Sequence, residues 1–408
     1  MPIEKKTLWI AVGFSALLIV AILIATGAIN LTKKTAKIEL AVWGFDSPAV
    51  WEGITAKYHR DNPTVTVTYK TLSPAAYETD LLNGLATGAG PDIFMIMNPW
   101  LARHGNKMIP APRDIATAAE VDSLFPTAVT QELTNAGSAY ALPLYMDTYA
   151  LMYNKDLFDK AGITLPPNNW LAFQEMAKKL GKNSAALGGS EATVEGASDI
   201  LALLMMQDGV RMTDTDGKAR LTGGAGALSF YTKFTNPKGG YYAWDNKLPT
   251  AFTRFARGTL PMALGTHAEV MALRAANPSL RIGVTPMPQA PAASVNFASY
   301  AALAVWVGSP HATEAWRFIS DLTTNPENAL LYAVSAKTPP VLRSLIGQFE
   351  NDPDVGVFAR QALTARPWYR VNENAARATF SAMIESVTSG ARTIAEALRT
   401  AENALNNE

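Results

Sequence analysis

The stretch from Ile38 to Met97 reads IELAVWGFDSPAVWEGITAKYHRDNPTVTVTYKTLSPAAYETDLLNGLATGAGPDIFMIM, and it alternates two patterns. Short apolar or alternating runs have the length of strands, and the segments between them have the apolar spacing of amphipathic helices. The predicted strands are 38–43, 65–69 and 93–97, and the predicted helices are 48–60 and 77–87. The order β-α-β-α-β predicts a mainly parallel sheet with helices on both faces.

Ligands of open α/β sheets collect at the carboxyl ends of the strands. In this stretch the rule points to Gly44–Ser47, after the first strand, and to Asn98–Trp100, after the third. These two loops are the first candidates for a binding site.

The rest of the chain continues the alternation of strands and helices, without an internal repeat of fixed period. Further strands are expected at 149–153, 260–264, 281–284 and 300–307. Further helices are expected at 155–161, 170–180, 199–207, 225–234, 250–257, 313–322, 326–334, 355–364, 374–389 and 393–406. The segment 182–196 is rich in Gly, Ser and Ala, which indicates a loop.

Composition excludes several classes of protein. The 408 residues are 48% hydrophobic and 17% charged, which is typical of a globular body large enough for two lobes. Lys plus Arg and Asp plus Glu both number 35, so the basic excess of a nucleic-acid binder is missing. Cysteine is absent, which excludes disulfides, thiolate metal sites, cysteine nucleophiles and a lipoprotein anchor.

The N-terminus carries an uncharged, mostly apolar run from Leu8 to Ile29, after Lys5 and Lys6. As a helix it would extend roughly 33 Å, enough to cross the hydrocarbon core of a bilayer. We therefore predict a transmembrane helix within residues 1–31, and a tether at 32–37. With the N-terminus inside, the folded body lies on the extracytoplasmic side of the cell membrane.

Two other interpretations of this run remain open. Small residues at Ala25, Gly27 and Ala28 could form the cleavage site of a signal peptide, whose apolar region is usually shorter, about 7–15 residues. The run could also be a buried core helix, although nothing around it is amphipathic.

Several phrases along the chain, in order, carry a family resemblance. They are Ile38 to Gly44, Gly90-Pro-Asp-Ile93, Tyr140-Ala-Leu-Pro143 with Asp147, Tyr153-Asn-Lys-Asp-Leu-Phe158, Phe255 to Ala263, Ala315-Trp-Arg-Phe-Ile319 and Pro339-Pro340. The ordered set resembles the family 1 extracellular solute-binding proteins of ABC transporters, the family of the maltose-binding protein. The likeness extends over about 38–406.

The resemblance implies a periplasmic-binding-protein-like α/β fold of two lobes, with a hinge and a ligand cleft between them. The first lobe is then expected to comprise 38–146 and 262–309, and the second 147–261 and 310–408. It also implies a monomer that captures a small polar solute, a sugar or oligosaccharide, by hinge closure and passes it to the permease of an ABC importer. The alternatives are a non-sugar solute, or an anchored sensory or adhesion module that uses the same cleft.

A sugar site needs aromatic surfaces for the ring, with carboxylates and amides for the hydroxyls. The resemblance implies that Asp46 and Asp147 contact the ligand, although Asp46 could instead cap the helix that begins at Pro48, and Asp147 could form a structural salt bridge. Tyr145 lies one strand period before Asp147 and points to the same face.

The remaining candidates are polar or aromatic residues in predicted loops. They are Asn98 and Trp100 after the third strand, His267 after Gly265-Thr266, Tyr300 at the start of a strand that borders the cleft in relatives, and the adjacent Trp368 and Tyr369 as a stacking surface. For Asn98-Pro99 a simple turn is the alternative, and for a lone histidine a structural role.

The sequence contains few motifs that are typical of an enzyme. The four histidines include no pair at metal-binding i, i+4 spacing, and the chain has neither a Gly-x-Ser-x-Gly elbow nor a phosphate-binding loop. We expect no enzymatic activity, no metal and no cofactor.

Overall fold

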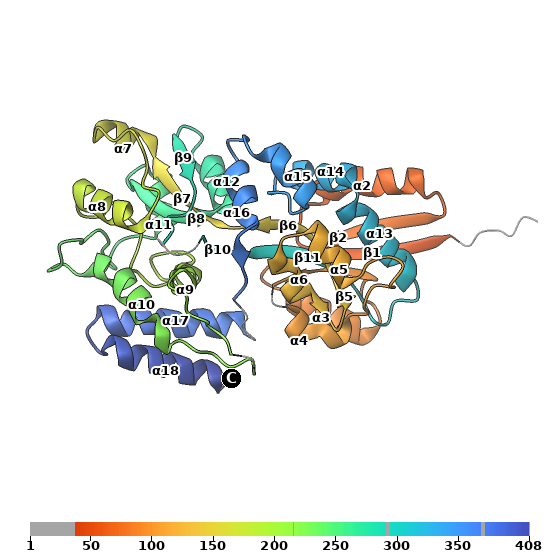
Figure 1. The fold of residues 1–408 in the computed structure, drawn as a ribbon. Coiled ribbons are helices and arrows are strands. Elements are labelled where there is room, and N and C mark those ends of the chain that lie inside the picture. The colour runs from red at the N-terminus through yellow and green to blue at the C-terminus, as the bar shows by residue number, and fades with distance from the viewer. Residues whose placement is uncertain (1–36, 99, 215, 291–293, 369–371, 408) are drawn as a thin grey trace, which may run out of the picture.

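The computed structural model describes residues 37–407 apart from 99, 215, 291–293 and 369–371, and it shows two lobes side by side (Figure 1). Each lobe has a hydrophobic core of its own. The two-lobe α/β fold predicted from the sequence is therefore confirmed.

The sheet of the first lobe has five strands in the order β2-β1-β3-β11-β6. Three are parallel neighbours from the opening stretch, β1 (Ile38–Gly44), β2 (Val65–Thr71) and β3 (Ile93–Met97). β11 (Ser299–Val305) runs antiparallel to both its neighbours, β3 and β6 (Leu142–Asp147). The carboxyl ends of β1, β2, β3 and β6 consequently meet at one edge, which faces the second lobe in Figure 1.

Helices cover both faces of this sheet. They are α2 (Pro48–Asp61), α3 (Tyr77–Thr87), α4 (Trp100–His104), α5 (Ala118–Leu124), α6 (Thr127–Leu133), α13 (Ala312–Thr324), α14 (Pro326–Ala336) and α15 (Arg343–Ile346), with the short strands β4 (Thr134–Asn135) and β5 (Ser138–Ala139) after α6. Local signals set their ends: α2 begins with a proline, and α3 ends at Gly88 with φ 73°, a left-handed conformation that suits glycine.

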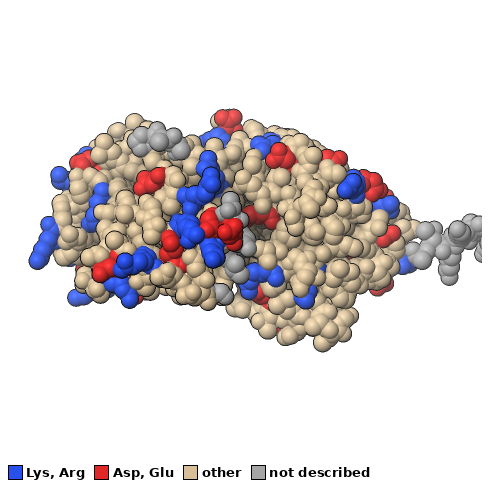
Figure 2. Space-filling view, turned by 60° about the horizontal axis from the view of Figure 1, so that its bottom comes forward, with Lys and Arg blue, Asp and Glu red and all other residues tan. Residues whose placement is uncertain are grey.

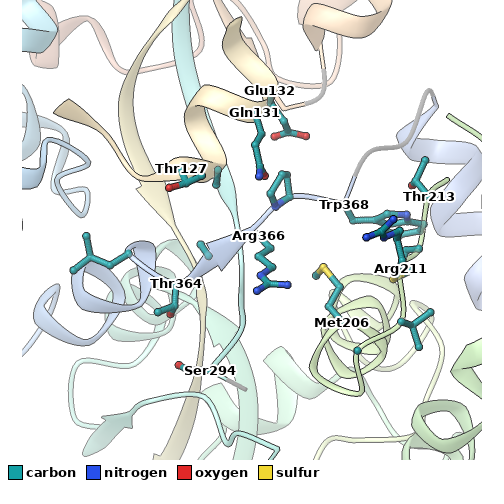
Figure 3. Close-up of a pocket in the computed structure, with 17 residues that line it drawn as sticks. Thr127, Gln131, Glu132, Met206, Arg211, Thr213, Ser294, Thr364, Arg366 and Trp368 are labelled. Atoms are coloured by element: carbon teal, nitrogen blue, oxygen red, sulfur yellow. The ribbon is translucent and has the colours of Figure 1, made fainter. Parts of the chain in front are cut away.

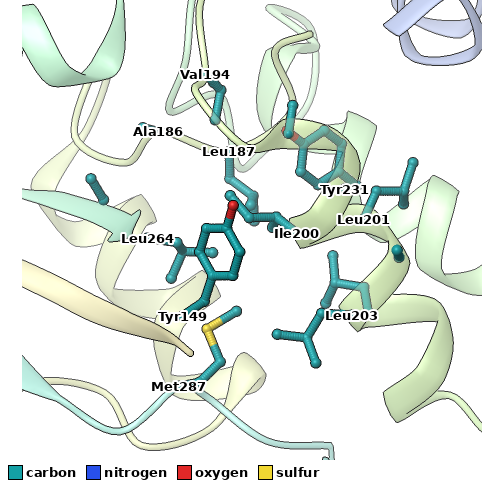
Figure 4. Packing of buried hydrophobic residues seen from close by; sticks show 14 of the residues in the cluster. Tyr149, Ala186, Leu187, Val194, Ile200, Leu201, Leu203, Tyr231, Leu264 and Met287 are labelled. Atoms are coloured by element: carbon teal, nitrogen blue, oxygen red, sulfur yellow. The ribbon is translucent and has the colours of Figure 1, made fainter. Parts of the chain in front are cut away.

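In the second lobe β7 (Tyr149–Asn154) pairs antiparallel with β8 (Met262–Thr266) and with β9 (Ile282–Thr285). The helices of this lobe are α7 (Lys155–Lys160), α8 (Trp170–Leu180), α9 (Ala197–Gln207), α10 (Ala225–Thr232), α11 (Ala251–Ala256), α12 (His267–Ala276), α17 (Glu373–Thr388) and α18 (Ile394–Asn406). Every residue of α9 is buried, and Figure 4 shows its Ile200, Leu201 and Leu203 among Tyr149, Tyr231 and Leu264.

The chain crosses between the lobes in three places. β6 continues into β7 through Thr148, and β10 (Asn296–Phe297) continues into β11 through Ala298. The third crossing includes α16 (Gly356–Ala362), whose Phe358 packs in the second core while Ala362 packs in the first. After it, β12 (Ala365–Arg366) pairs in parallel with β10.

The lobe boundaries differ from those expected. β8, α12 and β9 pack in the second core, although 262–309 was expected in the first lobe. Conversely α13 and α14, within the expected second-lobe segment 310–408, pack on the first sheet through Trp316, Ile319 and Tyr332. The reason is pairing: β8 forms its hydrogen bonds with β7, and an apolar pattern alone does not reveal the partner of a strand.

The predicted anchor or signal segment, 1–31, and most of the tether lie outside the described residues. Among the residues that the structure describes, no helix is long and apolar enough to cross a membrane.

Candidate functional site between the lobes

An aromatic row lies where β1 and β3 end. Phe45 follows β1, Tyr77 opens α3 and Trp100 opens α4; the Phe45 and Tyr77 ring centroids are 5.4 Å apart, and those of Tyr77 and Trp100 5.8 Å. The buried Tyr77 is held in place because its hydroxyl lies 2.8 Å from the carbonyl oxygen of Met95. Phe45 and Trp100 are partly exposed, so the row presents apolar ring surface at the edge facing the second lobe.

Asp46 is tied into the first lobe. Its carboxylate accepts hydrogen bonds from Trp51 Nε1 at 3.1 Å and from the Tyr332 hydroxyl at 3.0 Å. Burial raises the pKa of Asp46, while these two donors oppose the rise. The carboxylate does not cap α2, since no side chain caps that helix, and Asp46 remains partly exposed beside Phe45.

Asn98 is buried and joins two strands. Its side-chain nitrogen donates to the carbonyl oxygen of Ala298 at 3.1 Å, and its oxygen accepts from the backbone N–H of Tyr300 at 3.3 Å. The amide therefore connects the end of β3 to the crossing before β11.

Asp147, the last residue of β6, caps a helix of the other lobe. Its carboxylate accepts from the backbone N–H groups of Thr148, His267 and Ala268 at 2.8, 2.9 and 3.0 Å. The last two are the first residues of α12, where unsatisfied N–H groups favour an anion. Burial raises the pKa of Asp147 to about 6, with the three N–H donors acting in the opposite direction. Tyr145 lies on the same face and is partly exposed.

The imidazole of His267 lies inside the protein. It is 2% exposed, its ring centroid is 5.4 Å from that of Phe358, and burial lowers its pKa to about 4. The next residue, Ala268, is exposed. At this helix start Ala268, rather than the histidine ring, is therefore accessible to solvent.

Tyr300 and Trp368 lie elsewhere. Tyr300 faces away from Asp147, and its buried hydroxyl donates to Glu132 on α6 at 2.7 Å. Trp368 is 4% exposed, with its ring centroid 4.7 Å from that of Phe380, and lines a pocket beside α6. Tyr369 lies outside the described residues. The predicted site residues are thus split between two faces of the crossing strands.

The second lobe contributes a charged cluster that the sequence did not reveal. Arg377 on α17 lies 2.8 Å from Asp199, 3.1 Å from Glu373 and 3.5 Å from Glu191. Asp199 is buried and also accepts from the Tyr149 hydroxyl at 3.3 Å. Glu373 and Arg377 form an i, i+4 pair on α17, but Asp199 and Glu191 lie 178 and 186 residues from Arg377, so no local spacing links them to that pair. Figure 2 shows acidic and basic side chains gathered on the second-lobe side of the indentation between the lobes.

Phe45 and Tyr77 were also missed as candidates. A signal was available: Phe45 falls within the first candidate loop, and the helix predicted at 77–87 begins at the same sheet edge. Among the residues that the structure describes, no group of His, Asp or Glu side chains could hold a metal ion. The arrangement offers aromatic surface, hydrogen-bonding groups and a hinge.

Comparisons with known proteins agree with one another. The model of a family described as bacterial extracellular solute-binding protein matches residues 45–329. The maltotriose-binding protein of Pyrococcus abyssi (strain GE5 / Orsay) is 23% identical over 329 residues, covering 76% of this chain and 68% of that protein.

Two solved structures share the fold. The cyclic alpha-maltosyl-1,6-maltose binding protein of Arthrobacter globiformis superimposes with a TM-score of 0.79 at 19% identity, covering 91% of this chain and 99% of that one. The sugar-binding protein of Xanthomonas citri gives 0.75 at 19% identity, covering 90% and 96%.

Proposed function

This chain belongs to the bacterial extracellular solute-binding protein family, and from that premise we propose that it binds a sugar or oligosaccharide between its two lobes. Membership places the binding body outside the cytoplasm. Relatives and structural neighbours named for maltotriose, for cyclic maltosyl-maltose and for sugars in general support a carbohydrate.

The observation that carries the proposal is the aromatic row of Phe45, Tyr77 and Trp100 at the carboxyl ends of β1 and β3. This is the position at which open α/β sheets bind ligands. An aromatic ring offers a flat apolar face to the C–H groups of a sugar ring, with little conformational entropy to lose. We assign the sugar-stacking surface to Phe45 and Trp100, which are partly exposed.

Polar partners for the hydroxyls lie on both sides. From the first lobe we assign Asp46 and Tyr145, both partly exposed. From the second lobe we assign the cluster around Arg377. A ligand that contacts both sets favours the closed arrangement by its differential affinity for it.

The role that follows is capture for an ABC importer, without chemistry of the protein's own. In this proposal the closed form docks on the permease, and residues 8–29 hold the body at the membrane surface. A cleaved signal peptide would leave the same body free. The two cases differ in the mass of the mature chain, which mass spectrometry of the natively produced protein measures.

The test is calorimetric titration of the full-length chain, kept in mild detergent, with mono-, di- and oligosaccharides. We expect at least one carbohydrate to bind with micromolar affinity. Trp100→Ala and Phe45→Ala should each lower that affinity tenfold or more. The matched control is Tyr241→Ala, because Tyr241 is also partly exposed but packs against Glu175 on α8.

The outcomes separate the alternatives. Binding of another polar solute instead of any sugar would retain the fold and reject the substrate class. Binding of nothing tested would favour the sensory or adhesion role. A sugar that binds Trp100→Ala as tightly as the unmodified chain would remove the aromatic row from the site.

A further inference from the structure

A pocket of about 870 Å³ lies between the lobes beside the crossing strands. The first lobe lines it with Thr127, Gln131 and Glu132 of α6, and the second lobe lines it with Met206 and the segment 209–213. The crossing segment 363–368 runs along it (Figure 3). Its volume falls within the range of roughly 300–1,000 Å³ that is usual for small-molecule sites.

This pocket is separate from the proposed sugar site. In the pairing of β11 with β6, Tyr300 is opposite Met146, so their side chains share one face, whereas Tyr145 and Asp147 point to the other. Tyr300 reaches Glu132 in the pocket wall, while Asp147 reaches the start of α12. The crossing strands therefore stand between the two.

The chemistry of the pocket is set by two arginines. Neither the Arg211 nor the Arg366 side chain makes a hydrogen bond or an ion pair with any residue that the structure describes. Some arginines elsewhere are paired, as Arg103 is with Glu78 and Arg281 with Asp156. Figure 3 shows Arg366 reaching into the open middle of the pocket.

The rest of the lining is mixed in character. Among the described residues of the lining, the acidic side chain is that of Glu132, which accepts a hydrogen bond from the Tyr300 hydroxyl. Met206 and Trp368 add apolar surface, and Thr213 and Ser294 add hydroxyls. Guanidinium groups bind carboxylates and phosphates through paired hydrogen bonds, and an apolar wall favours a ligand with a ring or hydrocarbon part.

We propose that this pocket is a second ligand site, which binds a small organic anion through Arg366 and Arg211. The carboxylate or phosphoryl group of the ligand pairs with the guanidinium groups, and its apolar part lies against Met206 and Trp368. The site is distinct from the sugar site, because none of the residues assigned to the sugar lines it.

The experiment titrates the full-length chain in detergent with phenyl phosphate and benzoate, with inorganic phosphate and glucose as controls. At least one organic anion is expected to bind at a single site, more tightly than inorganic phosphate. Arg366→Gln and Arg211→Gln should each weaken this binding tenfold or more. The matched control is Arg60→Gln, an exposed arginine on α2, which should change nothing.

Three results would overturn the proposal. One is no binding of either organic anion at millimolar concentration, and another is equal weakening by Arg60→Gln. The third is a parallel loss of sugar affinity in Arg366→Gln, which would make the pocket part of the sugar site. If the arginine variants lose anion binding but keep their sugar affinity, the two sites are separate. If the unmodified chain binds an organic anion but no sugar, the proposed function fails and the anion site stands.

Discussion

The carboxylate of Asp147 accepts a hydrogen bond from the backbone N–H of His267, 2.9 Å away, and so connects the two lobes. Asp147 ends β6 in the first sheet, whereas His267 begins α12 in the second core. A second hydrogen bond, from the backbone N–H of Ala268 to the same carboxylate, also joins the two lobes. This one side chain therefore fixes the start of α12 against the hinge.

Replacing Asp147 by Asn should change how stability depends on pH. Burial raises the pKa of Asp147 from 3.8 to about 6, so the folded protein binds this proton more tightly than the unfolded chain does. The stability that this group contributes is complete below about pH 4 and is lost as pH rises through about 6. Relative to Asp147→Asn, the unmodified protein should lose on the order of 3 kcal/mol over this window, since a difference of one in pKa is about 1.4 kcal/mol.

Urea unfolding of both proteins at intervals from pH 4 to 7 measures this difference. Glu269, whose pKa burial raises to about 7, is present in both proteins, but the Asp147 charge also raises that pKa, so the measured difference includes the response of Glu269. A difference that stays constant with pH would show that Asp147 does not titrate there.

Arg377→Gln should destabilise the second lobe. The substitution removes the Arg377 guanidinium from beside Asp199, whose side chain is 5% exposed. Loss of one partner of a buried pair costs about 3–5 kcal/mol, and we expect about 2–4 because the Arg377 side chain is 34% exposed. Denaturant unfolding measures the change, and the double variant Arg377→Gln with Asp199→Asn should recover part of it. No recovery would contradict the pairing.

Tyr332→Phe removes one of the two donors to Asp46. The ring still packs in the first core, so the expected cost is that of one buried hydrogen bond to a charged group, about 1.5–3 kcal/mol. Thermal unfolding measures it. Tyr231→Phe is the matched control in the second lobe, where the lost acceptor is the neutral carbonyl oxygen of Gly189, and it should cost less. Equal costs would argue against a charged Asp46.

Trp368→Ala should lower stability by about 3–5 kcal/mol, as expected for deleting a large buried side chain. Sugar affinity should remain within about threefold of the unmodified chain, since Trp368 lies against Phe380 on the other face of the crossing strands. Trp368→Phe should recover much of the stability. A selective loss of sugar binding in a stable Trp368→Phe variant would return this residue to the sugar site.

Local patterns predicted most elements because the apolar periodicity and the end signals agree. The helix expected at 326–334 is observed as Pro326–Ala336, and the one at 393–406 as Ile394–Asn406. Nothing was predicted between residues 101 and 139, where α5 and α6 have seven residues each, two turns of helix. So short a helix shows little periodicity, and its tertiary contacts stabilise it.

The candidate site was predicted less completely, because contacts between distant residues decide it. The sequence identified Asp46 and Trp100 by their place after strands, and both lie at the predicted sheet edge. It could not show that the Asp147 carboxylate would accept hydrogen bonds from the backbone of α12, since the two donor residues lie 120 and 121 residues away in sequence. Nor could it show that Tyr300 and Trp368 face the opposite side.

The position of β11 has a consequence for how the protein is made. This strand lies between β3 and β6, yet the chain reaches it only after the second-lobe elements from β7 to β9 have been synthesised. A nascent chain that emerges N-terminus first therefore carries a sheet without β11, in which the facing edges of β3 and β6 are both unpaired. Until Ser299–Val305 emerges, the first lobe is a target for chaperones and for aggregation, and its maturation is a late event in biogenesis.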